Sequence, residues 1–149
     1  MGGSYGGYMA NWLAVTSDRF RAIVTHASVW DLELERDTSD AGLLMDREFG
    51  DPRRNARNWL RQSPHARADS LRTPMLVIHG ARDQRVSLGN AQSLWMALQT
   101  RGVPSRYLVF PDENHWILKP QNARLWYQTV LAFLAEHVLG TPWERPALL

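Results

Sequence analysis

Three short runs of aliphatic, aromatic and β-branched residues constrain the fold of this chain more than any other feature. They lie at residues 22–25 (A-I-V-T), 75–78 (M-L-V-I) and 107–110 (Y-L-V-F). Each run is continuous rather than alternating with polar residues, which is the pattern of strands buried on both faces of a parallel sheet. We therefore expect about three parallel strands, near residues 21–27, 74–79 and 105–110.

Amphipathic helical patterns alternate with these runs. Residues 87–101 carry apolar side chains at helical spacing and are followed by Gly102, a typical helix stop. Residues 121–138 show the same spacing and are followed by Gly140. A further helix is expected at residues 6–16. Strands that alternate with helices predict an α/β fold.

Residues 31–74 interrupt this alternation, because they show no strand signal and their charge density rises. A short helix is predicted near residues 53–61, closed by Ser63-Pro64. Such a segment between two strands is expected to be an insertion that overhangs a binding cleft. The tail at residues 141–149 has two prolines and little periodicity. It is expected to be extended and packed on the surface or against a partner.

Composition narrows the class of protein. A chain of 149 residues has room for one domain with a single core. It contains no cysteine, which excludes disulfides and thiolate chemistry and favours a cytoplasmic location. No apolar run approaches the ~20 residues of a membrane helix, and the glycine-rich start lacks the features of a signal peptide. The net charge is only +2, with arginines scattered among acids, so neither nucleic acid nor a membrane is an expected partner.

The sequence G-G-S-Y-G at residues 2–6 matches the G-x-S-x-G nucleophile elbow. In that motif the serine, here Ser4, sits on a strained strand-to-helix turn, and side chains two residues to either side would collide. The following helix points its N-terminus at the serine, and the N–H of Tyr5 is the predicted oxyanion donor. By itself the motif is weak, because a glycine-rich start is as often a flexible tail. The helical pattern that follows at once favours the elbow.

A serine nucleophile needs a histidine to take its proton and a carboxylate to orient that histidine. In α/β-hydrolases the chain order is Ser, Asp, His, with the acid and the histidine just past successive strands. Asp83 follows the run at 75–78, and His115 follows the run that ends at Phe110. We therefore predict a triad of Ser4, Asp83 and His115 at the carboxyl ends of parallel strands.

The other histidines fit a catalytic role less well. His79 lies at a strand end and is interpreted as structural. His26 precedes the acid, so the chain order fails, while His65 and His137 have no evident carboxylate partner. No H-x-x-x-H or H-E-x-x-H pair occurs, so no metal and no cofactor is expected.

Three motifs together resemble one family. Residues 2–9 resemble the nucleophile segment of acylaminoacyl and dipeptidyl peptidases in the prolyl oligopeptidase family, residues 79–86 resemble their acid loop, and residues 111–115 resemble their histidine loop. The resemblance runs over essentially the whole chain. It implies the C-terminal portion of an α/β-hydrolase fold, and a serine peptidase that hydrolyses short peptides through an acyl-enzyme without a cofactor.

The resemblance also implies substrate contacts. Arg85 matches a residue that contacts a substrate backbone carbonyl near the cleaved bond, a role that suits a guanidinium. Val86 matches a position in the pocket for the residue before that bond. Val29, Trp30 and Leu32 match the region of the opposite wall, with packing in the core as the open alternative.

The chain departs from the family at its start. Family members carry several strands, and usually a β-propeller, before the elbow. Residues 1–149 are therefore expected to be a partial catalytic domain, without a propeller, without a strand before Ser4 and without the loop that supplies a second oxyanion donor. Two alternatives stay open, a catalytically inactive truncated fragment and an α/β-hydrolase esterase. Expected partners are short peptide substrates and either the missing N-terminal part of the enzyme or a second copy of the chain.

Overall fold

A parallel sheet forms the centre of the computed structural model, which describes all of residues 1–149. Four strands follow one another in spatial order: β1 (Gly2–Gly3), β2 (Ile23–His26), β3 (Met75–Gly80) and β4 (Ser105–Phe110). All three neighbouring pairs are parallel, and Thr25, Val77 and Tyr107 stand side by side across the sheet. The predicted α/β fold and its three long parallel strands are confirmed.

Strand β1 corrects one expectation, since no strand was predicted before Ser4. Gly2 and Gly3 pair in parallel with Thr25 and His26, and the N–H of Ser4 donates to the carbonyl of His26 at 3.0 Å. Two glycines carry no apolar pattern, so only the backbone ladder reveals this strand. The two residues that precede Ser4 are therefore held in place by their pairing with β2.

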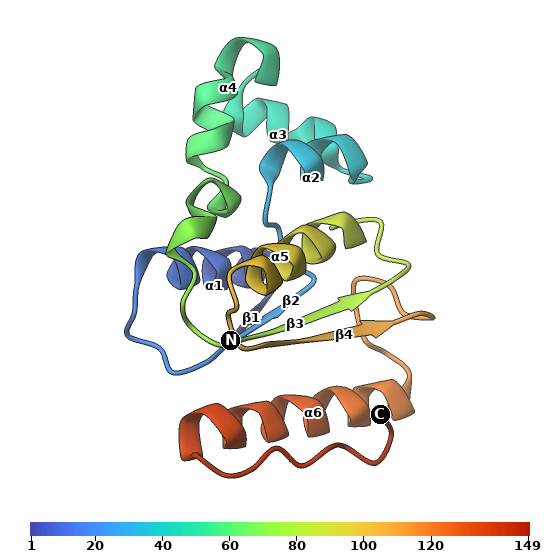
Figure 1. Ribbon diagram of the computed structural model, residues 1–149. Helices are drawn as coiled ribbons and strands as arrows, with labels where there is room; N and C mark the ends of the chain where they lie inside the picture. The colour runs from blue at the N-terminus through green and yellow to red at the C-terminus, as the bar shows by residue number, and fades with distance from the viewer.

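Helices cover both faces of the sheet (Figure 1). On one face lie α1 (Tyr5–Thr16) and α5 (Leu88–Thr100), and on the other lies α6 (Pro120–Leu134), which continues into a π-helical turn (Ala135–Leu139). Met75 and Val77 of β3 pack into the first layer, whereas Leu76 and Ile78 pack into the second. This two-sided burial explains why the β3 run is continuously apolar.

The connection between β2 and β3 forms a separate helical layer beyond α1 and α5 (Figure 1). It contains α2 (Leu32–Thr38), α3 (Gly42–Phe49), α4 (Pro52–Arg61) and a 3-10 helix (Pro64–Ser70). Helix α4 matches the prediction, but α2 and α3 were not foreseen. Their start signals are local: the Asp31 carboxylate caps α2 by accepting from two backbone N–H groups, at 2.9 and 3.3 Å.

The tail after the π-helical turn has no regular structure and runs along α6 (Figure 1). Its Trp143 ring lies under the guanidinium of Arg106 on β4, with 3.6 Å between the guanidinium carbon and the ring centroid. The tail thus packs on the surface of the domain, as expected. None of the helices is both long and apolar enough to cross a bilayer.

Candidate active site

Ser4 occupies a strained turn between β1 and α1. Its φ of 56° and ψ of −122° lie outside the regions that non-glycine residues favour. Hydrogen bonds hold it there, because its N–H donates to His26 (3.0 Å) and its carbonyl accepts from Tyr8 (2.9 Å). A Cβ at Gly2 would come within 2.1 Å of the Gly6 carbonyl oxygen. The predicted collision is confirmed for Gly2 but is wrong for Gly6, whose Cβ would meet nothing within 4 Å.

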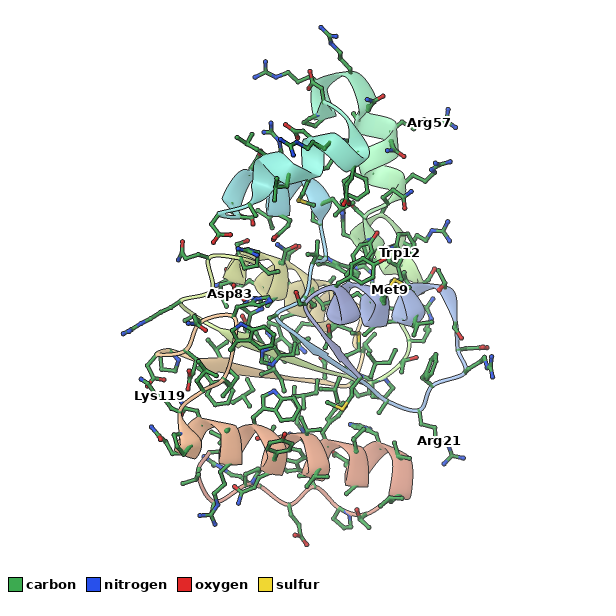
Figure 2. The ribbon with its side chains drawn as sticks, turned by 180° about the vertical axis from the view of Figure 1, so that it is seen from behind. Met9, Trp12, Arg21, Arg57, Asp83 and Lys119 are labelled. Carbon is green, nitrogen blue, oxygen red and sulfur yellow. The ribbon has the colours of Figure 1, made fainter.

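Asp83 and His115 meet at the carboxyl end of the sheet. Asp83 follows β3 and His115 follows β4, and Nδ1 of His115 lies 2.8 Å from Oδ2 of Asp83. The other carboxylate oxygen of Asp83 accepts from the N–H groups of Arg85 and Val86, both at 2.9 Å. Figure 2 shows Asp83 at this end of the molecule and Arg21, which precedes β2, at the other. Two loops anchored on neighbouring strands therefore fix the pair.

The surroundings of Asp83 keep it ionised. Burial by itself raises the pKa of this carboxyl, but hydrogen bonds from His115, His79 and the Val86 N–H outweigh burial and hold the pKa well below its usual range. An ionised Asp83 can only accept a hydrogen bond, so Nδ1 of His115 carries the proton and donates this hydrogen bond to Asp83. Nε2 of the neutral ring then has a free lone pair, as a general base requires.

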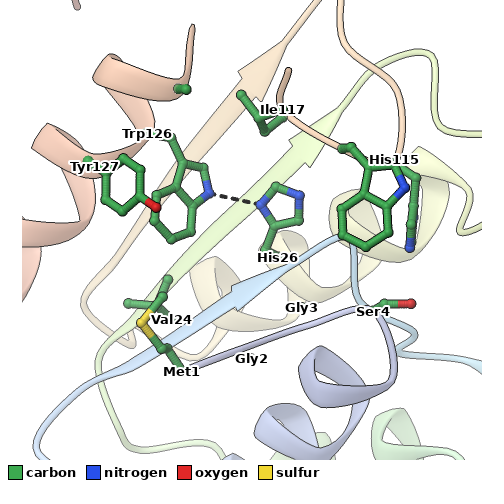
Figure 3. Close-up of a pocket in the computed structure, with 12 residues that line it drawn as sticks. Met1, Gly2, Gly3, Ser4, Val24, His26, His115, Ile117, Trp126 and Tyr127 are labelled. Carbon is green, nitrogen blue, oxygen red and sulfur yellow. Dashed lines mark hydrogen bonds between the residues drawn. The ribbon is translucent and has the colours of Figure 1, made fainter. Parts of the chain in front are cut away.

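Ser4 and His115 line a common cavity of about 510 Å³ (Figure 3). No hydrogen bond joins the Ser4 hydroxyl to the His115 ring in this structure. Such bonds are often long without substrate and tighten when the reacting group binds. The structure thus joins Asp83 to His115 and places Ser4 at the same cavity, without a hydrogen bond between Ser4 and His115.

A second cavity, of about 250 Å³, opens on the other side of Ser4. Four of the five substrate-pocket residues suggested by the sequence line it: Val29, Leu32, Arg85 and Val86. Leu44, Met45 and Phe49 of α3 complete the lining, so the helical insertion does overhang a cavity. Trp30 follows the alternative that the sequence left open, because it is buried in the core cluster and does not line the cavity.

The positions of Arg85 and Tyr5 add detail that the sequence lacked. Arg85 Nε lies 2.7 Å from Oδ1 of Asp40, a partner that sequence reasoning missed, and its side chain is 58% exposed. Tyr5 is the first residue of α1, so its N–H has no partner within the helix. That N–H is positioned next to Ser4, and the Tyr5 side chain is exposed.

Glu35 on α2 is a cavity residue that sequence reasoning missed. It is 4% exposed and lines the second cavity, and its Oε2 accepts from the Asn90 amide at 3.0 Å. Burial, the largest effect, raises the pKa of Glu35 to about 7. A glutamate in a charged helical stretch looks like a surface residue, and only the packing of α2 against α5 buries it.

The remaining histidines lie outside the pair. His79 is fully buried, and its Nε2 lies 2.9 Å from the Val86 carbonyl oxygen, which agrees with a structural role. His65 lies 3.6 Å from Asp31 and His137 lies 3.5 Å from Glu136, but neither histidine lines a cavity beside Ser4. The structure contains no group of three or more His, Asp or Glu side chains that could hold a metal ion.

The chain is similar in sequence to known dipeptidyl-peptidases. Dipeptidyl-peptidase 5 of Aspergillus fumigatus is 39% identical over 142 residues, which is 91% of this chain and 19% of the relative. Dipeptidyl-peptidase 5 of Porphyromonas gingivalis is 39% identical over 140 residues, 90% of this chain and 20% of the relative. The chain therefore spans about a fifth of the length of these relatives.

Solved structures show the same arrangement of elements. Acylaminoacyl peptidase of Pyrococcus horikoshii matches with a TM-score of 0.87 and 27% identity, over 92% of this chain and 23% of that one. A puromycin hydrolase matches with a TM-score of 0.87 and 26% identity, over 99% of this chain and 23% of that one. The model of the prolyl oligopeptidase family matches residues 1–141. By this match over nearly its whole length, the chain belongs to the prolyl oligopeptidase family.

Proposed function

We propose that this chain carries the catalytic centre of a serine peptidase that cleaves short peptides, with Ser4 as nucleophile, His115 as general base and Asp83 as the group that orients His115. The observation that carries the proposal is the 2.8 Å contact between His115 and Asp83 beside a cavity shared with Ser4. Relatives named dipeptidyl-peptidase and acylaminoacyl peptidase support a substrate that is cleaved close to its N-terminus.

In the first half of the reaction, the Ser4 hydroxyl attacks the carbonyl carbon of the scissile bond and gives its proton to Nε2 of His115. The negative charge that develops on the carbonyl oxygen is stabilised by the N–H of Tyr5 and by the N-terminal end of α1. The bond to the leaving amine then breaks, and His115 returns the proton to that amine. The products are a free amine and an ester between the substrate acyl group and Ser4.

In the second half, water takes the place of the amine. His115 accepts a proton from the water as its oxygen bonds to the acyl carbon, and then gives that proton to the departing Ser4 oxygen. Asp83 stays ionised throughout and stabilises the positively charged ring of His115. The acid product leaves, and Ser4 is restored.

The second cavity is the proposed pocket for the side chain that precedes the scissile bond. Val29, Leu32 and Val86 offer it apolar contacts. Arg85 lies at the cavity rim, where its guanidinium could exchange the exposed contact with Asp40 for a substrate carbonyl. A small or medium-sized apolar side chain is the proposed occupant, because the cavity is about 250 Å³.

A fluorophosphonate probe tests the nucleophile directly. The folded chain should gain one probe adduct on Ser4, located by mass spectrometry, and the Ser4→Ala variant should gain none. His115→Ala should fold but react far more slowly, since its serine lacks a base. A folded wild-type chain that stays unlabelled, or a label on another residue, would contradict the assignment.

The substrate class is tested with three reporters, two of which are amides with the same aryl amine as leaving group and one of which is an ester. These are an unblocked dipeptidyl arylamide, an N-acetyl-aminoacyl arylamide and a p-nitrophenyl ester. Ser4-dependent release from either arylamide supports a peptidase, and the preferred arylamide identifies the accepted N-terminus. Turnover of the ester alone would favour the esterase alternative.

A further inference from the structure

His26 is the last residue of β2 and lies in the cavity shared by Ser4 and His115. We propose that His26 is a positioning residue for the peptidase proposed above: its ring, held by Trp126, supports the segment that carries His115, while its main-chain carbonyl holds Ser4. This inference rests on the proposed function and assigns a role to a histidine outside the triad.

The ring of His26 is fixed by α6. The indole Nε1–H of Trp126 lies 2.9 Å from Nδ1 of His26, across one hundred positions of sequence (Figure 3). An indole N–H can only donate, so Nδ1 of His26 must be the acceptor and its proton must sit on Nε2. Trp126 thereby selects one tautomer of His26 and points an Nε2–H away from α6.

The other side of the ring faces the segment after β4. Figure 3 shows the His26 ring between Trp126 and the segment that carries His115 and Ile117. His26 and His115 line the same cavity, so the Nε2 side of the His26 ring lies beside the segment that carries His115. Burial is the largest effect on this ring and lowers the pKa of His26 to about 4. At neutral pH the ring is therefore uncharged, as acceptance from Trp126 requires.

The main chain of His26 is tied to the nucleophile. Its carbonyl accepts from the N–H of Ser4 at 3.0 Å, and Gly3 is its partner in the ladder between β1 and β2. Gly7 also packs tightly against this carbonyl group, since a Cβ at Gly7 would lie 2.9 Å from the His26 carbonyl oxygen. The strained turn of Ser4 thus rests on the backbone of the residue whose ring supports His115.

One residue therefore connects the two loops whose spacing decides whether Ser4 can reach His115. Asp83 fixes the orientation of the His115 ring. The His26 ring, held by Trp126, is the proposed support for the segment that carries His115. Loss of the His26 ring should let the His115 segment shift without removing any triad group. A displacement of ~1 Å at a catalytic group costs on the order of 10²-fold in rate.

The experiment compares four variants of the chain. His26→Phe keeps a ring of similar size but removes the acceptor for Trp126 and the Nε2–H. His26→Gln places an amide N–H near the position of Nε2 and should restore part of the support. Trp126→Phe removes the indole donor and keeps an aromatic ring at this position. Tyr127→Phe is the matched control, because Tyr127 is the next residue on α6, lines the same cavity and makes no hydrogen bond through its hydroxyl.

Two readouts are measured for each variant: kcat and KM with the preferred arylamide, and the downfield proton resonance of the hydrogen bond between Asp83 and His115. His26→Phe should lower kcat roughly 10- to 100-fold with KM changed by less than about twofold, and should shift or broaden the resonance. His26→Gln should recover part of both. Trp126→Phe should show a smaller loss of about 3- to 10-fold in kcat.

Values for His26→Phe equal to those of Tyr127→Phe would overturn the proposal, as would a change in KM alone. If His26→Phe does not fold, Trp126→Phe decides, and its agreement with the control would likewise overturn the role. A wild-type chain without Ser4-dependent hydrolysis would refute the proposed function. The resonance of each folded variant would still decide whether His26 positions His115.

Discussion

Replacing Glu35 by glutamine should change how the stability of the domain depends on pH. Glu35 is buried between α2 and α5 and lines the proposed substrate cavity. Burial raises its pKa from 4.5 to about 7. At about 1.4 kcal/mol per pKa unit, this corresponds to about 3 kcal/mol of unfolding free energy. A glutamine keeps the shape and can still accept from Asn90, but it never ionises.

The sign follows from proton binding. Between pH 4.5 and 7 the folded protein keeps the proton on Glu35, whereas the unfolded chain releases it. The unfolded state therefore binds fewer protons, and the contribution of Glu35 to stability falls as pH rises through this range. Above pH 7 both states are ionised and the loss is complete. Glu35→Gln should thus match the wild type near pH 4.5 and exceed it by up to about 3 kcal/mol at pH 8.

The assay is urea unfolding of the wild type and of Glu35→Gln from pH 4.5 to 8. Groups that titrate identically in both proteins do not contribute to the difference between their free energies of unfolding. Glu33→Gln is the matched control, since Glu33 lies on the same helix but is exposed, and a change there should stay within about 0.5 kcal/mol. A pH-independent difference between Glu35→Gln and the wild type would refute the reasoning. So would a variant that is less stable at pH 8, which would mean that ionised Glu35 stabilises the fold.

Three further perturbations test the proposed centre. Asp83→Asn should leave the fold intact but lower kcat roughly 10³–10⁴-fold, measured with an arylamide, because the amide no longer selects the His115 tautomer. Arg85→Ala should weaken arylamide turnover more than ester turnover, by about 1.5–3 kcal/mol in the ratio of kcat/KM values, and equal losses would assign Arg85 a structural role. Gly2→Ala should slow fluorophosphonate labelling of Ser4 and lower Tm, because its Cβ would meet the Gly6 carbonyl at 2.1 Å. Gly6→Ala, with open space around its Cβ, should change both far less, and the reverse order would contradict the geometry of the turn.

The sequence by itself determined the framework of the sheet and the positions of the proposed triad. The continuous apolar runs mark strands covered on both faces, and β3 indeed sends Met75 and Leu76 into opposite layers. Residues that follow parallel strands share one edge of the sheet, so the positions of Asp83 and His115 in the chain were enough to predict that they meet. The apolar pattern of each segment thus indicates the strands, and the shared direction of parallel strands indicates that Asp83 and His115 lie at the same edge of the sheet.

Only the tertiary structure decided the contacts that surround these residues. Strand β1 consists of two glycines, so its existence depends on the ladder with β2 and not on any side-chain pattern. The pairing of Arg85 with Asp40 and the burial of Glu35 depend on how the insertion folds over the cavity. Likewise, the contact of His26 with Trp126 requires α6 to lie against the end of β2. Sequence periodicity reports that a face is buried, but the partner on that face is set by packing between segments far apart in the chain.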